Sequence, residues 1–347
     1  MNYFRHKNKR FRFLLCEMCF LTFFFSSSII SNAQETDSAY TYRLISWNVE
    51  NLYDTDNDTL KNDDAFTPEG ENHWTKKRYI AKLNKICRVL AATSVIGNVM
   101  PTIVGLAEVE NDKVLRDLTQ GTFLRKYRYR FVHFDSHDAR GIDNALLYRE
   151  DYFKPFFSQA IDVTDSIIEL ITRDLLLVEG TTIEGDTLIV VMCHLPSKRG
   201  GSAANIRREH VAKKLRSCLD TIKEQHPQAA IVAMGDFNAS PDEREIASLN
   251  GNGFVNMMLK MENGMGSHKY QGIWAYLDQI VVSSAMLDRQ CPMQVGNAQV
   301  FALDFMLVDD ERHLGKVPLR TYQGMKYLGG YSDHLPIGLD LMRIKTQ

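Results

Sequence analysis

The chain has little cysteine, proline or glycine, with 6, 9 and 21 of these residues among 347. So few prolines and glycines exclude a collagen-like or low-complexity chain, and no repeat of solenoid length is present. The four cysteines after residue 33 are too few for a disulfide framework. Cys87 and Cys218 each lie on an apolar stripe at helical spacing, which predicts core thiols rather than a zinc site or a catalytic cysteine.

The chain also lacks an excess of positive charge, because its 41 lysines and arginines are offset by 43 aspartates and glutamates. Broad electrostatic adhesion to polyanions usually needs a basic surface, so this sequence argues against it. A phosphate-bearing substrate held through a metal ion stays compatible with the composition. With 44% hydrophobic and 24% charged residues, the composition is typical of a globular protein.

Residues 1–33 have the pattern of a secretory signal peptide. Five basic residues precede an apolar run over residues 13–30, and the run ends in Ser31, Asn32 and Ala33. An uncleaved membrane anchor is the alternative, which Glu17 and three serines within the run weaken. We therefore expect cleavage, a secreted or periplasmic protein, and a mature chain of residues 34–347 with a formal charge of −6.

The mature chain alternates strand-like and helical patterns only in part. Strong helical periodicity covers residues 76–92 and 205–223, with a shorter helix near 112–118. Several of the apolar, strand-like runs follow one another with only turns between them, which favours layered sheets with helices outside over a doubly wound sheet. These runs cover residues 42–47, 102–107, 129–134, 144–148, 175–179, 187–193, 229–234, 277–282 and 336–341.

Polar residues of similar chemistry lie at the ends of five of these strands, four sets after a strand and one set just before the last strand. A rigid sheet can aim such side chains at one point, and Mg²⁺ prefers carboxylate and amide oxygens together with substrate phosphates. The inventory indicates a metal-assisted phosphoester hydrolase. Its members are Asn48, Glu50, Glu108, His194, Asp236, Asn238, Asp333 and His334.

Each short motif is weak alone, but their order along the chain is specific. SWNVENL, LAEVEN, CHLPSKRGG, MGDFNASP, YLDQIVVS and YSDHLP together resemble the endonuclease/exonuclease/phosphatase superfamily over residues 42–341. GLAEVEND and ARGIDNALLY are most similar to its bacterial secreted members, usually described as extracellular nucleases. The resemblance implies an α/β fold, a four-layer α-β-β-α sandwich in which two mixed β-sheets lie face to face between helices. It also implies that residues 34–347 form a single domain.

The resemblance also implies roles for individual residues. Glu108 would be the main metal ligand, with Asn48 close by, Glu50 as a second acid near the metal and Asp333 as a metal or orienting ligand. Asp278 would fix the tautomer of His334. We name His334 as the general base and Asp236 as its alternative. His194 would donate to the phosphate or the leaving oxygen, and Asn238 and Asp236 would bind phosphate or a second ion.

Three polar segments allow both a functional and an ordinary interpretation. Lys198, Arg199, Arg207 and Arg208 could hold phosphate or could cover a solvated loop and helix face. Residues 54–58 begin like a calcium loop, but Ala65 replaces the closing glutamate, so we expect a solvated insertion. Residues 125–130 alternate basic and aromatic side chains, which favours a strand with an exposed basic face over a nucleic-acid track.

These inferences predict a secreted phosphodiesterase that uses Mg²⁺, with Mn²⁺ as a substitute, and in-line attack of water on phosphorus. Nucleic acid, DNA or RNA, is the expected substrate, and a sphingomyelin-type lipid or an inositol phosphate is the alternative. A non-catalytic binding module is disfavoured because no expected ligand is missing. We expect a monomer without stable membrane association once the signal is cleaved.

Overall fold

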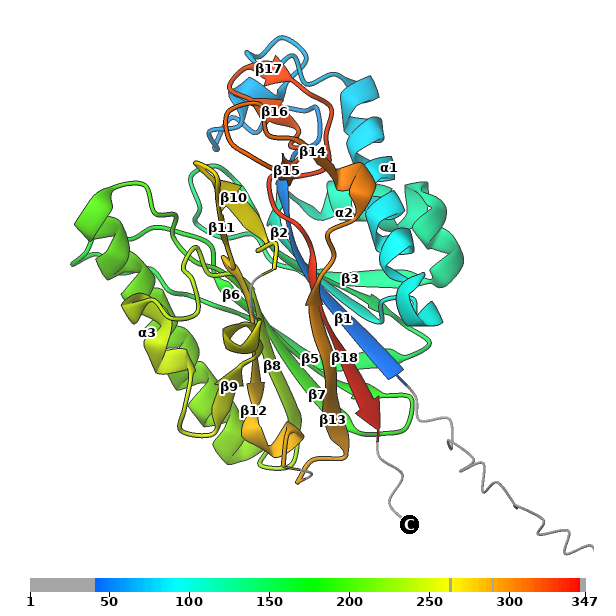
Figure 1. Ribbon diagram of the computed structural model, residues 1–347, viewed down its shortest axis with the longest axis vertical. Helices are drawn as coiled ribbons and strands as arrows, with labels where there is room; N and C mark the ends of the chain where they lie inside the picture. The colour runs from blue at the N-terminus through cyan, green and yellow to red at the C-terminus, as the bar shows by residue number, and fades with distance from the viewer. Residues whose placement is uncertain (1–40, 262–263, 289, 344–347) are drawn as a thin grey trace, which may run out of the picture. The chain divides into compact units, whose positions relative to one another are not determined.

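Two six-stranded β-sheets form the centre of the protein, as the computed structural model in Figure 1 shows. The structure describes residues 41–261, 264–288 and 290–343. The predicted signal peptide and its cleavage site lie outside the described residues. Among the residues that are described, no helix is long and apolar enough to span a membrane.

The first sheet has the order β13-β18-β1-β2-β4-β3. β1 and β2 are parallel, whereas the other neighbours in this sheet are antiparallel. The sheet is therefore mixed. Its strands are β1 (Thr41–Leu52), β2 (Ile103–Val109), β3 (Tyr129–His133), β4 (Asp143–Arg149), β13 (Met293–Val300) and β18 (Ile337–Arg343).

The second sheet has the order β5-β6-β7-β8-β12-β9, and only β7 and β8 are parallel in it. The carboxyl ends of the parallel pairs β1–β2 and β7–β8 lie at the same end of the sandwich (Figure 1). The strands are β5 (Phe153–Ile161), β6 (Leu175–Thr182), β7 (Thr187–His194), β8 (Ala230–Asp236), β9 (Phe254–Asn256) and β12 (Asp278–Ser283).

Three helices cover the outer faces of the sheets. α1 (Lys76–Thr93) and α2 (Asp112–Gly121) lie outside the first sheet, and α3 (Gly201–Gln225) lies outside the second (Figure 1). Leu44 and Val190 belong to the core between the sheets, whereas Ile45 and Ile189 face the helices. Both faces of the central strands are buried, which explains their nearly continuous apolar runs. The four-layer sandwich of two mixed sheets between helices is thereby confirmed.

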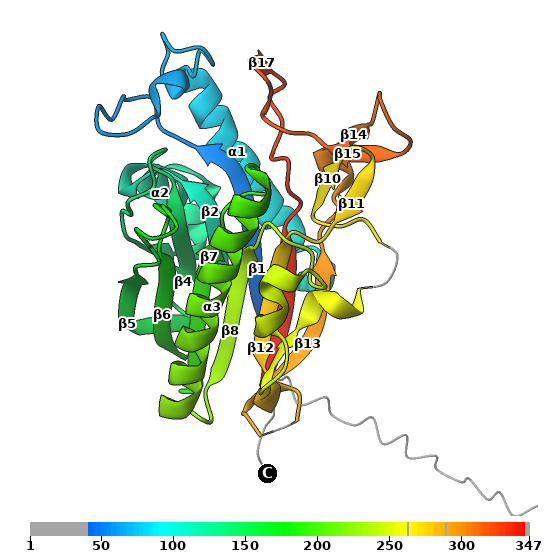
Figure 2. The same cartoon turned by 90° about the vertical axis from the view of Figure 1, so that its left-hand side faces the viewer.

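Short elements decorate the ends of the sandwich. Figure 2 shows the hairpins β10–β11 and β14–β15 next to each other on one side of the molecule. The hairpins are β10 (His268–Tyr270) with β11 (Ile273–Ala275), β14 (Leu307–Asp309) with β15 (Lys316–Pro318), and β16 (Tyr322–Gln323) with β17 (Lys326–Tyr327). The 3-10 helices are Asp64–Phe66, Ile96–Asn98, Phe123–Tyr127, Arg244–Leu249, Met257–Lys260, Ser284–Met286 and Asp304–Met306.

The nine predicted strands are all present, but β5, β9 and β13 of the two large sheets and the six short hairpin strands were not predicted. β5, β9 and β13 are edge strands of their sheets, so they need no continuous apolar run. The strand predicted at residues 125–130 is wrong in its first half: residues 123–127 form a 3-10 helix, and Arg128 has a φ of 54°. Tyr129 and Phe131 do pack in the core beside an exposed Arg130, which ion-pairs with Glu150.

Two further sequence expectations need correction. Cys218 is only half-buried, although Cys87 is buried as predicted. Residues 54–58 are not uniformly solvated, because Asp54 is buried with its carboxylate 2.9 Å from Lys113 Nζ, while the side chain of Asp56 is 78% exposed. The buried aspartate therefore anchors this insertion to α2.

Candidate active site

Strand ends from both sheets bring polar side chains together around the buried carboxylate of Asp236, the last residue of β8. Asn48 of β1 donates its Nδ2 to Asp236 Oδ2 at 3.0 Å. His194 Nε2 at the end of β7 lies 3.5 Å from the same oxygen, and His334 Nε2, just before β18, lies 3.7 Å from it. Residues separated by up to 286 positions therefore meet at one oxygen atom.

His334 is held in one orientation by three hydrogen bonds. Its Nδ1 lies 2.7 Å from Oδ2 of Asp278, the first residue of β12, and both side chains are buried. Its backbone N–H donates to Ser332 Oγ, and its carbonyl accepts from Trp47 Nε1. His194 follows the buried Cys193, which faces the helix-side core, so the predicted alternation of these two side chains holds. The predicted pairing of His334 with Asp278 is present in the structure.

The backbone itself is distorted where the site begins. The non-glycine residues Glu50, Asn51, Glu108 and Asn238 have φ angles of 54°, 56°, 66° and 49°. The β1–β2 register shifts between Asn48 and Leu52, and the β2–β4 register shifts around Glu108. Bulges and left-handed residues re-aim side chains and cluster at functional sites. In this protein the irregularities fall at Glu50 and Glu108, so they set the direction of these two acidic side chains.

Glu108 has one carboxylate oxygen anchored and one oriented toward a basic side chain. Its Oε2 accepts from the backbone N–H of Asn51 at 2.9 Å, and its Oε1 lies 3.7 Å from Arg140 Nη1. Asn48 faces Ala107 in the β1–β2 register, so Glu108 is one residue further along the neighbouring strand. The carboxylate and amide oxygens of Glu108 and Asn48 are hard donors that suit Mg²⁺ or Mn²⁺.

Glu50 and Asp333 surround a guanidinium that the sequence pattern did not reveal. Arg320 donates through Nε to Glu50 Oε1 at 3.1 Å and through Nη2 to Asp333 Oδ2 at 2.9 Å. The backbone N–H of Thr321 adds a 2.6 Å bond to Glu50 Oε2. Both predicted metal ligands are therefore paired with a permanent cation. No motif marked Arg320, because it lies 270 residues from Glu50 in a segment without regular periodicity.

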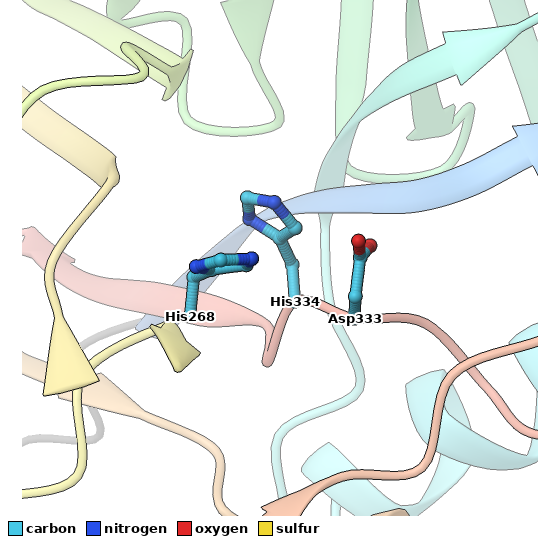
Figure 3. Close-up of side chains that lie close together, drawn as sticks. All are labelled: His268, Asp333 and His334. Carbon is cyan, nitrogen blue, oxygen red and sulfur yellow. The ribbon is translucent and has the colours of Figure 1, made fainter. Parts of the chain in front are cut away.

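His268 is a second residue of the site that the sequence did not reveal. Its ring centroid lies 4.8 Å from that of His334, and the backbones of His268 and His334 form an isolated antiparallel β-bridge. Figure 3 shows His268 and Asp333 on either side of His334. Burial, followed by the charge of His334, lowers the pKa of His268 to about 4. His268 is therefore neutral at pH 7.

The two histidines beside Asp236 differ in charge. Burial, and then the charges of Arg173 and Arg140, hold the pKa of His194 well below its ordinary value. Burial also lowers the pKa of His334, but the carboxylates of Asp278 and Asp236 outweigh it and hold that pKa well above its ordinary value. Burial raises the pKa of Asp236 to about 6. The site thus combines a neutral imidazole, an imidazolium and a carboxylate that titrates near neutrality.

The remaining predicted polar residues separate into site and framework. Asn238 donates its backbone N–H to Asp236 Oδ1 and its Nδ2 to the carbonyl of Leu195, so it lies beside the cluster. Lys198 pairs with Glu243 at 2.5 Å, Arg207 donates to the carbonyl of Ile168, and Arg208 is buried against the carbonyls of residues 196 and 197. These three side chains have structural partners, whereas Arg199 is exposed.

The model of the Endonuclease/Exonuclease/phosphatase family matches residues 43–343, which is nearly all of the described part. The chain belongs to this family. Its members hydrolyse phosphodiester bonds and generally use divalent metal ions. A search of curated proteins by sequence gave no match.

Solved structures of low sequence identity share the fold. D. rerio TDP2 complexed with single strand DNA product is 20% identical, with a TM-score of 0.54, over 87% of this chain and 98% of that one. The human Nocturnin catalytic domain with bound sulfate is 19% identical, with a TM-score of 0.52, over 88% and 95%. A family protein from Bacteroides thetaiotaomicron is 15% identical, with a TM-score of 0.55, over 88% and 99%.

Proposed function

We propose that this family member is an exported, divalent-metal-dependent phosphodiesterase that acts on nucleic acid. The observation that carries the proposal is the convergence of Asn48, His194 and His334 on Asp236 Oδ2, with Glu108 at the neighbouring strand end. Export is proposed from the basic and apolar pattern of residues 1–33.

Glu108 and Asn48 would hold a Mg²⁺ or Mn²⁺ ion. When bound, the ion neutralises negative charge that develops on the phosphate oxygens during attack. Glu50 and Asp333 already share the guanidinium of Arg320. We therefore assign one ion to the Glu108 end of the site and assign Arg320 as the neutralising cation at the other end.

Asp236 is the proposed acceptor of the proton from the attacking water, which is the alternative that the sequence left open. His334 carries a proton between Asp278 and Asp236, so it is suited to stabilise charge on the phosphate rather than to act as a base. His194 and Asn238 would orient the phosphate through their N–H groups. Asp278 would keep the ring of His334 in place.

Two half-exposed arginines favour a substrate with more than one phosphate. The side chain of Arg140 is 45% exposed next to Glu108, and that of Arg320 is 43% exposed next to Asp333. Guanidinium groups suit phosphate recognition, and they flank the cluster on both sides. The DNA product bound to D. rerio TDP2 agrees with a nucleic-acid substrate on this fold.

A lipid phosphodiester is the second candidate because apolar side chains project close to the site. In the β10–β11 hairpin, which carries His268, Tyr270 is 68% and Ile273 is 73% exposed, and Leu314 before β15 is 96% exposed. Exposed apolar tips of this kind can contact a lipid surface. The substrate test must therefore include lipid.

The decisive experiment incubates the purified protein and Mg²⁺ or Mn²⁺ with plasmid DNA, RNA, sphingomyelin vesicles and inositol phosphates. We expect nicking of nucleic acid that a chelator abolishes. Glu108→Ala should lower the rate roughly a thousandfold, or about 4 kcal/mol at ~1.36 kcal/mol per tenfold, and His334→Ala should abolish it.

Glu311→Ala, in an exposed loop, is the matched control and should keep parental activity. Activity of Glu108→Ala within about tenfold of the parent would exclude Glu108 as the metal ligand. Turnover of lipid or inositol phosphate alone would keep the site and reverse the substrate. A lack of turnover of all four substrates would favour a non-catalytic binding module.

A further inference from the structure

A second group of metal-ligating side chains lies at the β3–β4 edge of the first sheet, next to the end of β2 that carries Glu108. His133 is the last residue of β3, Asp135 follows it, and Asp143 is the first residue of β4. One ligating atom from each lies within 4.8 Å of the others. β3 is two strands from β2, whereas Asp143 is on the adjacent strand β4 and faces Val109 of β2, so the group begins about 5 Å from the strand that carries Glu108.

His133 is oriented as metal-binding histidines usually are. Its Nδ1 lies 3.0 Å from a carboxylate oxygen of Asp112, at the first position of α2, and its side chain is only 2% exposed. A carboxylate that accepts from one ring nitrogen fixes the tautomer and leaves the other nitrogen as a ligand. Nε2 of His133 therefore faces Asp143.

Two buried atoms in this group have no hydrogen-bond partner, namely Nε2 of His133 and Oδ1 of Asp143. Nε2 lies 3.7 Å from the other oxygen of Asp143, which is too far for a hydrogen bond. Buried polar atoms without partners are costly and call for an explanation. An ion between the imidazole and the carboxylates would satisfy both atoms.

The group also lacks a basic side chain. Within residues 41–343, as far as they are described, neither Asp135 nor Asp143 ion-pairs with a lysine or arginine, and Arg116 contacts only Asp112. Burial lowers the pKa of His133, but the nearby carboxylates of Asp143, Asp112 and Asp135 outweigh burial and raise it. The surroundings of the imidazole are therefore negative and favour a cation.

We propose that His133, Asp135 and Asp143 bind a first-row divalent ion, Zn²⁺ or Mn²⁺, with water completing its coordination. One imidazole and two carboxylates suit such ions, whereas Mg²⁺ and Ca²⁺ prefer oxygen donors alone. Ligand bonds of about 2.0–2.2 Å need ligand atoms roughly 3–4 Å apart, so the observed spacing requires only small side-chain adjustments. The site contains no cysteine, so no cysteine pattern could have indicated it.

The bound ion would brace the loop of residues 134–142. Its ligands stand at both ends of this loop, and the loop carries Arg140 beside Glu108 and Asp138, which accepts from Arg173 Nη1 at 3.0 Å. The ion is therefore structural, and it goes beyond the proposed reaction because it needs no substrate. Its loss would displace Arg140 from the active site.

The test measures Zn²⁺ and Mn²⁺ bound per chain after equilibrium dialysis of the chelator-treated protein. To separate this site from the proposed catalytic ion, each variant is made in the parent and in Glu108→Gln. We expect His133→Gln and Asp135→Asn to bind one Zn²⁺ fewer than their background in both cases. His137→Gln, on the same loop and exposed, is the matched control and should bind as its background does.

Zn²⁺ should also raise the Tm of Glu108→Gln but not of Glu108→Gln combined with His133→Gln. Asp135 is exposed, so Asp135→Asn folds even if His133→Gln does not. Unchanged Zn²⁺ and Mn²⁺ stoichiometry in Asp135→Asn would overturn the site and would mean that His133 is simply a buried imidazole held by Asp112. Retained zinc binding together with inactive protein would leave this site standing and would refute only the proposed function.

Discussion

Replacing Asp278 by asparagine should test the charge of His334 without changing the shape of the site. The carboxylate of Asp278 is fully buried, and its Oδ2 lies 2.7 Å from His334 Nδ1. Two unit charges about 4 Å apart attract by roughly 4 kcal/mol at an effective dielectric constant of about 20. Part of this attraction persists in the variant because Asp236 also faces His334, at 3.7 Å. We therefore expect kcat to fall about 10²- to 10³-fold, with KM changed little.

The assay is turnover of the best substrate from the panel above, measured as a function of substrate concentration for parent and variant. Asp309→Asn is the matched control, because the side chain of Asp309 is 87% exposed and pairs with the exposed Lys316. Circular dichroism and thermal unfolding establish that Asp278→Asn is folded. A folded variant with kcat within tenfold of the parent would refute the inference that an imidazolium at residue 334 supports the reaction.

Three further predictions concern stability. Burial raises the pKa of Glu110 to about 8, so the folded protein keeps a proton that the unfolded chain releases near the ordinary pKa of glutamate. The free energy of unfolding should therefore fall by about 1.4 kcal/mol per pH unit between roughly pH 5.5 and 7.5. Urea unfolding of Glu110→Gln at several pH values should lack this slope. Gly235 has a φ of 153°, and a Cβ added to it would lie 1.8 Å from the carbonyl oxygen of Cys193. Gly235→Ala should therefore lower the free energy of unfolding by more than about 3 kcal/mol. A loss under about 1 kcal/mol would contradict the close approach of β7 and β8. Arg320→Gln should cost roughly 1–2 kcal/mol, and a double-mutant cycle with Glu50→Gln should recover most of it; additive effects would show that the pair contributes nothing.

Much of the fold could be predicted because its central strands and helices are dictated by local patterns. The helix stripes around Leu83 and Leu215 and the apolar runs of β1, β7 and β8 are set by burial on one stripe or on both faces. The strands β5, β9 and β13 lack such a signal, and among the described residues each of them pairs along one edge only. The left-handed conformation of Arg128 likewise interrupts the alternation of basic and aromatic residues that predicted a strand at residues 125–130.

The candidate site was predicted to the extent that its residues stand directly at strand ends. Asn48, Glu108, His194 and Asp236 stand at the ends of buried runs and His334 stands just before one, so the sequence indicated that a rigid sheet would position them. The contacts of the site residues differ from the prediction where a segment that is distant in the sequence packs against them. Arg320 pairs with both Glu50 and Asp333, and His268 packs against His334, and neither contact has a local signature.

The sequence by itself therefore determined the chemical inventory and the layered architecture, because both depend on residue type and on short-range spacing. Only the tertiary structure decided how charge is distributed among those residues. Burial and neighbouring carboxylates separate a neutral His194 from a charged His334, and Arg320 neutralises two acids that the motifs mark as metal ligands. Such pairings are set by contacts between segments that are 13 to 270 residues apart, and no local pattern encodes them. The same reason hides His133 and Asp143, whose orphaned buried atoms become visible only when β3, β4 and α2 are packed together.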